Sequence, residues 1–353
     1  MSSFGKSPRS CATSALSERL RSMTIRAASV PLLLIPLAFS SCKKEPANDS
    51  QASKRTSDTR PAASLEHVPL FDGQSAFRIL KAQVSFGPRV PGSSAHERCM
   101  SYLLSELRKY ADAVTPQEFQ GTDGSKRYQL TNIIASFNLP ATDRVLLCAH
   151  WDSRPWADQD PLPANRKKPV PGANDGASGV AVLLELARLF HGQKPPVGVD
   201  IVLFDGEDLG HGGDFSGYAQ GSKYFAEHKG QSFNPRFGIL LDMVGKKDIS
   251  IPREQNSTTY APSVVDYVWS LAARLASSGR IDPRSFTDAP GPSVYDDHVP
   301  LNQAGIPAID LIDFDYPSWH TVNDTPDKCS PQSLASVGNL LAAVVYTLPQ
   351  VVQ

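Results

Sequence analysis

The chain has 353 residues, 41% hydrophobic and 20% charged, which is the composition of an ordinary globular protein. The formal net charge is -1 and charges of both signs are mixed along the chain, so nothing predicts a nucleic-acid-binding surface. The cysteines form no CxxC pair, which argues against a disulfide scaffold or a cysteine zinc site. One bridge among Cys99, Cys148 and Cys329 is left open.

Residues 1–42 are interpreted as a leader. An apolar run at 28–39 follows Arg21 and Arg26 and is too short to span a bilayer, which is typical of a secretory signal. Two serines and Cys42 follow, and this resembles a bacterial lipoprotein signal, although Phe39 stands where leucine is usual. We favour a lipid on Cys42 over the alternative of a soluble secreted protein.

Residues 43–66 are rich in lysine, serine, aspartate and alanine, and predict a flexible tether. Residues 67–353 are predicted to form a single catalytic domain. The expected location is therefore outside the cytoplasm, in the periplasm or cell envelope, with membrane contact only through the amino-terminal lipid.

Helices and apolar strands alternate in this domain. Apolar residues at helical spacing predict helices over 76–86, 96–110, 178–191 and 264–277. Short apolar runs predict strands over 130–137, 144–149, 199–204, 237–241 and 308–312. Continuous apolar strands separated by helices indicate an α/β fold, a three-layer sandwich with a central, mainly parallel twisted sheet.

Polar side chains follow four of these strands at the point where each strand ends. In open α/β sheets this edge binds ligands. Carboxylates gathered there would repel one another or take up protons unless a cation lay among them, and histidine with aspartate or glutamate suits zinc. The residues concerned are His150, Asp152, Asp175, Asp205, Glu207, Asp208, Asp242, Asp313, Asp315 and His320.

Each of these residues also has an ordinary structural interpretation. Asp175 precedes a helix and could cap it, and an aspartate after a strand is usually part of a turn. His320 could be a hydrogen-bonded core histidine, and Glu207 with Asp208 could lie in a solvated loop. Such explanations suffice singly, but they do not account for so many groups at one edge of one sheet.

Five motifs in a fixed order carry a resemblance to a known family. They are HWDS at 150–153, GANDGASG at 172–179, DGED at 205–208, LLDMVG at 240–245 and WHT at 319–321. Together they resemble the zinc aminopeptidase/glutaminyl cyclase superfamily, from about residue 70 to the end.

The resemblance implies two alternatives that share their residues. A type II glutaminyl cyclase would hold one zinc with Asp175, Asp208 and His320. Glu207 would then move a proton, and Asp242 with Asp296 would complete an acid network. An aminopeptidase would hold a second zinc with His150 and Asp242, with Asp175 bridging the two ions and Glu207 as general base. A third alternative, a non-catalytic binding module, is disfavoured because no ligand position is damaged.

Further segments resemble the cyclases more than the aminopeptidases. They are the stretch 152–161, the YDDHVP sequence at 295–300, and Trp319 directly before His320. The resemblance implies peptides or proteins with amino-terminal glutamine as substrates, bound in a small pocket walled by Tyr295, Tyr316 and Trp319. Asp208 departs from the family, which usually has glutamate there.

Overall fold

The computed structural model describes residues 64–213 and 215–348, which fall within one compact unit, Arg60–Gln353. The leader, Cys42 and nearly all of the predicted tether lie outside the described residues, so the domain boundaries and the lipid anchor stay predictions. Among the described residues, no helix has the length and apolarity needed to cross a membrane.

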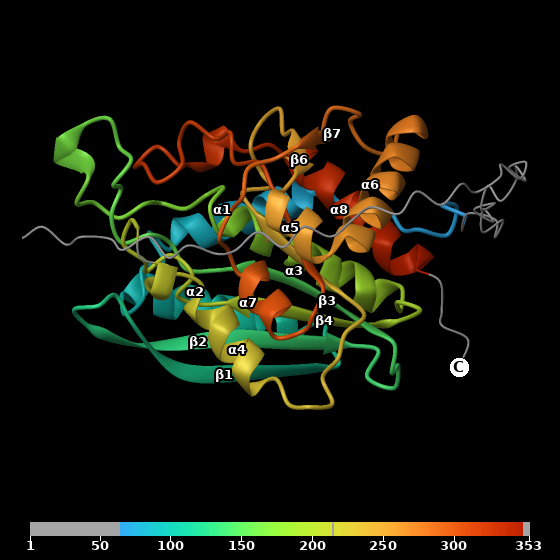
Figure 1. Cartoon of the computed structure of the whole chain (residues 1–353), viewed down its shortest axis with the longest axis horizontal. Helices are drawn as coiled ribbons and strands as arrows, with labels where there is room; N and C mark the ends of the chain where they lie inside the picture. The colour runs from blue at the N-terminus through green and yellow to red at the C-terminus, as the bar shows by residue number, and fades with distance from the viewer. Residues whose placement is uncertain (1–63, 214, 349–353) are drawn as a thin grey trace, which may run out of the picture. The chain divides into compact units, whose positions relative to one another are not determined.

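A six-stranded sheet forms the centre of the unit, in the order β1-β2-β4-β3-β5-β8. The first four strands in this order are labelled in Figure 1. β4, β3, β5 and β8 pair in parallel, whereas β1 and β2 add an antiparallel edge. The strands are β1 (Ala113–Thr122), β2 (Arg127–Phe137), β3 (Arg144–His150), β4 (Gly198–Phe204), β5 (Gly238–Asp242) and β8 (Ala308–Ile312), and a separate pair comprises β6 (Ile251–Arg253) and β7 (Phe286–Pro290).

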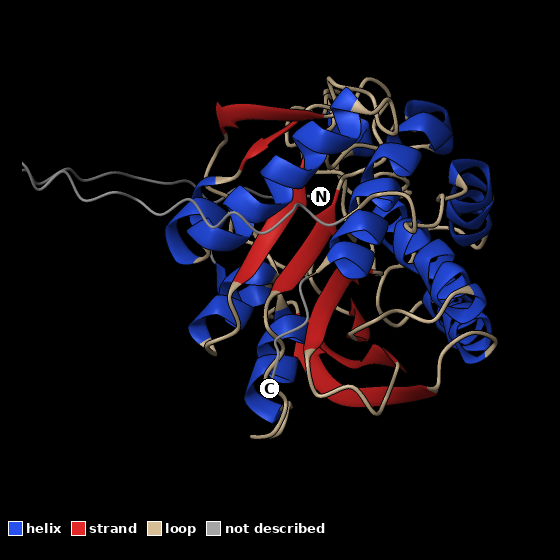
Figure 2. Cartoon of the chain, turned by 90° about the vertical axis from the view of Figure 1, so that its right-hand side faces the viewer, coloured by secondary structure: helices blue, strands red, loops and turns tan. Residues whose placement is uncertain are grey.

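Helices cover both faces of the sheet (Figure 2). Side chains alternate along each strand, so Leu147 and Ala149 of β3 join the larger core cluster, whereas Leu146 and Cys148 join the opposite one. The larger cluster includes α1 (Gly73–Ser85), α2 (Ser94–Arg108), α3 (Ala177–Gly192), α6 (Pro262–Ser277) and α8 (Pro331–Thr347), and the other includes α4 (Gln220–His228) and α7 (His298–Gln303). The predicted α/β sandwich with a mainly parallel sheet is confirmed.

The strands predicted from apolar runs are all present, and the prediction for β8 matches to the residue. The edge strand β1 was not predicted, because Pro116 and polar residues interrupt its pattern. Proline is tolerated there because β1 pairs on one side only, with β2. Also missed were α4, α5 (Gln255–Tyr260), α7, α8 and the pair β6 and β7.

The disulfide left open by the sequence does not form. Cys99, Cys148 and Cys329 are buried and free. Cys99 belongs to α2, Cys148 to β3, and Cys329 precedes α8. Cys99 and Cys148 lie in different core clusters, where they pack as small apolar side chains.

Candidate metal centre

The predicted site residues meet at the carboxyl edge of the parallel strands. His150 is the last residue of β3 and Asp242 the last of β5. Glu207 and Asp208 follow β4 within a few residues, and Asp175 precedes α3. All of these side chains are buried, as is that of His320, which follows β8. Strand polarity therefore brings together residues that are far apart in the chain.

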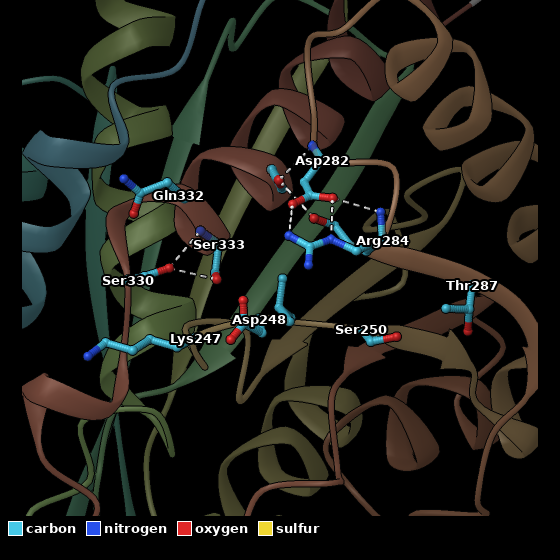
Figure 3. Close-up of a pocket in the computed structure, with 12 residues that line it drawn as sticks. Lys247, Asp248, Ser250, Asp282, Arg284, Thr287, Ser330, Gln332 and Ser333 are labelled. Carbon is cyan, nitrogen blue, oxygen red and sulfur yellow. Dashed lines mark hydrogen bonds and ion pairs between the residues drawn. The ribbon is translucent and has the colours of Figure 1, made fainter.

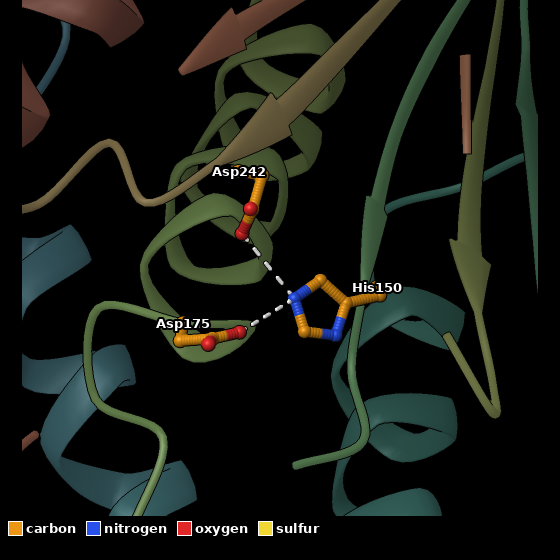
Figure 4. A group of neighbouring side chains, drawn as sticks. All are labelled: His150, Asp175 and Asp242. Carbon is orange, nitrogen blue, oxygen red and sulfur yellow. Dashed lines mark hydrogen bonds and ion pairs between the residues drawn. The ribbon is translucent and has the colours of Figure 1, made fainter. Parts of the chain in front are cut away.

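His150, Asp175 and Asp242 form one group of potential ligands (Figure 4). Nε2 of His150 lies 3.1 Å from Oδ1 of Asp175 and 3.3 Å from Oδ1 of Asp242. Burial alone would lower the pKa of His150, but the carboxylates of Asp152, Asp175 and Asp242 raise it well above its usual value. The imidazole therefore already has two carboxylate partners on the side that faces the other ligands.

Asp175, Asp208 and His320 form the second group. Nε2 of His320 lies 3.7 Å from Oδ2 of Asp175 and 3.5 Å from Oδ1 of Asp208. Asp175 thus belongs to both groups and presents one oxygen to each imidazole. Its role as a helix cap is excluded, because α3 begins after Gly176 and has no side-chain cap.

The donors fit a zinc ion in number, type and spacing. In each group the donor atoms lie within 4.8 Å of one another. Two ligands of a tetrahedral zinc, each about 2.0–2.1 Å from the metal, are about 3.3 Å apart, close to the separations around both His150 and His320. Oδ2 of Asp208 is buried without a hydrogen-bond partner, and burial raises the pKa of Asp208 to about 6. A cation among these groups would satisfy that oxygen and compensate the buried charge.

Asp152 connects the first group to the acidic loop after β4. Its carboxylate accepts the main-chain N–H groups of Glu207 and Asp208, both at 3.2 Å. One of its oxygens also lies 3.4 Å from Nδ1 of His150. Asp152 therefore orients an imidazole and holds the DGED loop at the same time. The sequence placed Asp152 at the sheet edge but gave it no role.

Asp324 holds the shared ligand, and sequence reasoning missed it. Its carboxylate accepts the main-chain N–H groups of Asn174 and Asp175 at 2.9 and 3.1 Å, and the hydroxyl of Tyr316 at 2.6 Å. Burial, then the charge of Asp175, raises the pKa of Asp324 to about 6. Its position four residues after His320, in a WHTVND sequence, was the available signal.

Backbone strain is concentrated beside the ligands. His320 has φ +53° and Met243, directly after Asp242, has φ +48°, a region that such residues rarely adopt. Gly176 has φ +88°, and a Cβ there would lie 2.7 Å from the main-chain oxygen of Asp152. Only glycine fits at this point, so the GANDGASG loop can pass close to β3 and place Asp175 between the two imidazoles.

Buried acids lie next to the ligands. Glu207 has a pKa well above its usual value because of burial and the neighbouring charges of Asp208 and Asp296. Burial, then the charge of Asp242, raises the pKa of Asp296 to about 7. Burial raises that of Asp242 to about 6. Burial and the charges of their neighbours therefore raise the pKa values of these acid residues together.

The three aromatic residues predicted to wall a pocket have different surroundings. The ring of Trp319 stacks on His320, with centroids 3.9 Å apart. Tyr295 is half-buried and packs against Phe215, with centroids 5.0 Å apart. Tyr316 is buried and its hydroxyl donates to Asp324. Substrate binding by these residues stays a prediction.

A cavity away from these residues is shown in Figure 3. It has a volume of about 740 Å³ and is lined by the segment after β5, the start of β7 and the first turns of α8. None of the candidate ligands lines it. The site described above is therefore identified by its chemistry, not by its size.

Residues 132–345 match the model of peptidase family M28, which spans β2 to α8 and every candidate ligand. The chain belongs to peptidase family M28. Aminopeptidase YwaD of Bacillus subtilis is 30% identical over 59% of this chain, and the match spans only 42% of that protein. Glutaminyl-peptide cyclotransferase of Drosophila melanogaster is 26% identical over 72% of this chain and 76% of that protein.

Solved structures of bacterial family members are more similar. A leucine aminopeptidase precursor from Bacteroides thetaiotaomicron is 38% identical, with a TM-score of 0.75 over 79% of this chain and 98% of that one. A Zn-dependent exopeptidase from Parabacteroides distasonis is 37% identical, with a TM-score of 0.74 over 79% and 99%. The glutaminyl cyclase of B. thetaiotaomicron bound to N-acetylhistamine is 39% identical, with a TM-score of 0.74 over 79% and 99%. Overall similarity therefore does not separate the two activities.

Proposed function

We propose that this M28 family member is a glutaminyl-peptide cyclotransferase that uses one zinc. The observation that carries the proposal is the difference between the two ligand groups in the distances from the histidine Nε2 atom to the carboxylates. Nε2 of His150 is within hydrogen-bonding distance of Asp175 and Asp242, so the chain itself closes the first group. Nε2 of His320 has only the longer approaches of 3.5 and 3.7 Å, which leaves the second group open for the metal.

The proposed reaction turns an amino-terminal glutamine into pyroglutamate. The α-amino nitrogen attacks the side-chain amide carbon, a C–N bond forms, and the bond to the departing nitrogen breaks with release of ammonia. Both groups belong to one residue, so proximity favours the attack. Zinc held by Asp175, Asp208 and His320 would supply a Lewis acid for the amide oxygen.

Glu207 is the proposed carrier of the proton from the attacking amine to the departing ammonia. Such a carrier must both accept and donate near neutral pH, which requires a pKa well above that of an ordinary glutamate. Burial and the charges of Asp208 and Asp296 raise the pKa of Glu207 in this direction. Asp242 and Asp296 would hold a shared proton next to it.

The substrate pocket is proposed to lie against Trp319 and Tyr295, with Tyr316 behind them. Trp319 packs on His320 and also on Phe314, with centroids 3.9 and 5.0 Å apart. These rings would form an apolar wall beside the ligands and fit one uncharged amide side chain. Peptides and proteins with amino-terminal glutamine are therefore the proposed partners.

A dizinc aminopeptidase is the second candidate, because the His150 group also satisfies the distance requirement for a metal. One incubation distinguishes the two. Purified protein is offered a peptide that begins with glutamine and a matched peptide that begins with leucine. The proposal expects ammonia from the first, nothing from the second, and one zinc per chain. Release of free amino acid with two zinc ions per chain would establish the aminopeptidase instead.

We also propose that the protein is exported and anchored through a lipid on Cys42. The support is the leader sequence alone, since this segment lies outside the described residues. Metabolic labelling with a radioactive fatty acid tests it. Label is expected on the native chain and not on Cys42→Ser, and an unlabelled native chain would show a soluble exported protein.

A further inference from the structure

Arg154 lies behind the second ligand group and contacts one of its members directly. The side chain is 1% exposed. Its Nη1 donates to Oδ1 of Asp208 at 2.7 Å and to the main-chain oxygen of Asp208 at 3.3 Å. Nε and Nη2 donate to the two carboxylate oxygens of Asp158 at 2.7 and 2.8 Å. One guanidinium therefore binds two aspartates with fixed geometry.

Asp158 extends this contact to a second ligand. Its Oδ1 lies 3.4 Å from Nδ1 of His320, the ring nitrogen that faces away from Asp175 and Asp208. Nδ1 makes no hydrogen bond to the described residues, so this contact is an ion-pair approach, and a carboxylate beside the second nitrogen of a histidine ligand favours one ring orientation. Arg154 and Asp158 together thus connect Asp208 to His320 from behind the site.

The two oxygens of Asp208 have different surroundings. Oδ1 is held by Arg154, whereas Oδ2 is buried without a hydrogen-bond partner. The side chain of aspartate is short, so the position of its carboxylate depends closely on the main chain and on the groups that hold it. Oδ1 also lies 3.5 Å from Nε2 of His320, so the hydrogen bond from Arg154 fixes the orientation of the carboxylate relative to that ligand.

The rings around Arg154 fix the plane of its guanidinium. The guanidinium carbon lies 5.3 Å from the ring centroid of Trp156 and 5.6 Å from that of Tyr218. Nη2 also lies 3.3 Å from the hydroxyl of Tyr218. Stacking and a planar fork of donors are properties that lysine lacks. This environment therefore selects arginine for its geometry as well as for its charge.

We propose that Arg154, acting with Asp158, is the positioning residue that fixes the carboxylate of Asp208 beside His320 for zinc binding. This inference rests on zinc at the second group, as in the proposed function, but not on which reaction the zinc serves. Arg154 itself touches neither substrate nor metal. Its effect is expected in zinc affinity and coordination geometry, not in activity alone.

The test compares Arg154→Gln, Arg154→Lys and Asp158→Asn with the native chain. Zinc affinity is measured by competition with a chelator, and geometry by the visible absorption of the Co²⁺-substituted protein. Arg154→Gln is expected to weaken zinc binding by about 10–100-fold and to change the Co²⁺ spectrum. Asp158→Asn is expected to change both less, and Arg154→Lys should recover part of the affinity because it keeps the charge.

Arg144→Gln is the matched control. Arg144 at the opposite end of β3 makes a similar bidentate pair with Asp200, with both contacts at 2.8 Å, and lies far along the strand from His150. It should lower thermal stability without changing zinc affinity or the Co²⁺ spectrum. If Arg154→Gln does not fold, the zinc affinity and Co²⁺ spectrum of Arg154→Lys and Asp158→Asn test the positioning role.

Native zinc affinity and an unchanged Co²⁺ spectrum in the folded variants would overturn the positioning role. Loss of zinc affinity in Arg144→Gln to the same extent would also overturn it, because the effect would then be general destabilisation. Failure of the native chain itself to bind zinc would refute the metal of the proposed function instead, so the two failures can be distinguished.

Discussion

The two halves of the candidate metal centre are built from the same residue types but differ in the distances between their donor atoms. In the first half, Nε2 of His150 approaches Asp175 and Asp242 to 3.1 and 3.3 Å. In the second, Nε2 of His320 stays 3.5 Å from Asp208 and 3.7 Å from Asp175. The two sets of donors therefore differ in spacing although their composition is the same, and the proposed function rests on this difference.

The supports behind the two imidazoles also differ. Nδ1 of His150 faces Asp152, which also fixes the main chain of the acidic loop. Nδ1 of His320 faces Asp158, which is itself held by Arg154. The first half is thus connected to the loop that carries Glu207, and the second to a buried cation. This difference agrees with the proposal that zinc binds in the second half and that the first half positions the acidic loop.

Replacement of each histidine by alanine gives the largest expected difference between the two halves. His320→Ala removes a proposed ligand and should abolish zinc binding and turnover. His150→Ala should keep one zinc per chain and lose about 10–100-fold in turnover, as expected for a residue behind the ligands. Zinc content by atomic spectroscopy and ammonia release measure both effects. Equal zinc loss in the two variants would show that the halves are equivalent.

Substitution of Glu207 tests the proton transfer separately from zinc binding. Glu207→Gln keeps the size of the side chain but cannot carry the proton, so turnover should fall by about 10²–10⁴-fold while zinc content stays native. Steady-state ammonia release and zinc analysis on the same sample measure this. Full activity in Glu207→Gln would remove it from the mechanism and leave the choice of base open.

The stability of the metal-free protein should depend on pH. Burial raises the pKa of Asp242 from 3.8 to about 6, and burial with the charge of Asp242 raises that of Asp296 from 3.8 to about 7. The folded state then binds more protons than the unfolded state between these values, so stability falls as pH rises from about 4 to about 7. Thermal unfolding of metal-free protein across this range should show a decreasing midpoint.

Zinc and Asp296→Asn provide the controls for this pH dependence. Zinc should raise the unfolding midpoint more at pH 8 than at pH 5, because ionised carboxylates bind it better. Asp296→Asn should flatten the profile of the metal-free protein. A profile that rises with pH in the metal-free native protein would contradict the raised pKa values.

The smallest expected effect concerns the ligand that both halves share. Tyr316→Phe removes the hydroxyl that donates to Asp324, which in turn holds the main chain of Asp175. The free energy of unfolding should fall by about 1.5–3 kcal/mol, the usual range for a hydrogen bond to a charged group. Denaturant unfolding measures this. If zinc affinity fell by more, in free energy, than the stability of the fold, Asp324 would be shown to act directly on zinc binding by Asp175.

The sequence predicted β2, β3, β4, β5 and β8 and placed the candidate ligand residues at the carboxyl edge of the sheet, where the structure has them. This succeeded because buried parallel strands are continuous apolar runs, and the polar residues that follow them must meet at one edge. It did not predict β1, whose polar edge pattern with Pro116 carries no strand signal. It also gave no role to Asp152, Arg154 or Asp324, because aspartate and arginine in loops have no periodic pattern.

The amino-acid sequence by itself therefore determined which donors are available and which sheet edge carries them. Only the tertiary structure decided how they are shared. Asp175 lies between His150 and His320 because Asp324, 149 positions away, binds its main chain. Arg154 reaches Asp208, 54 positions away, and leaves one oxygen without a partner. Such contacts depend on strand register and on loop conformations such as that of Gly176, and neither is encoded in local spacing.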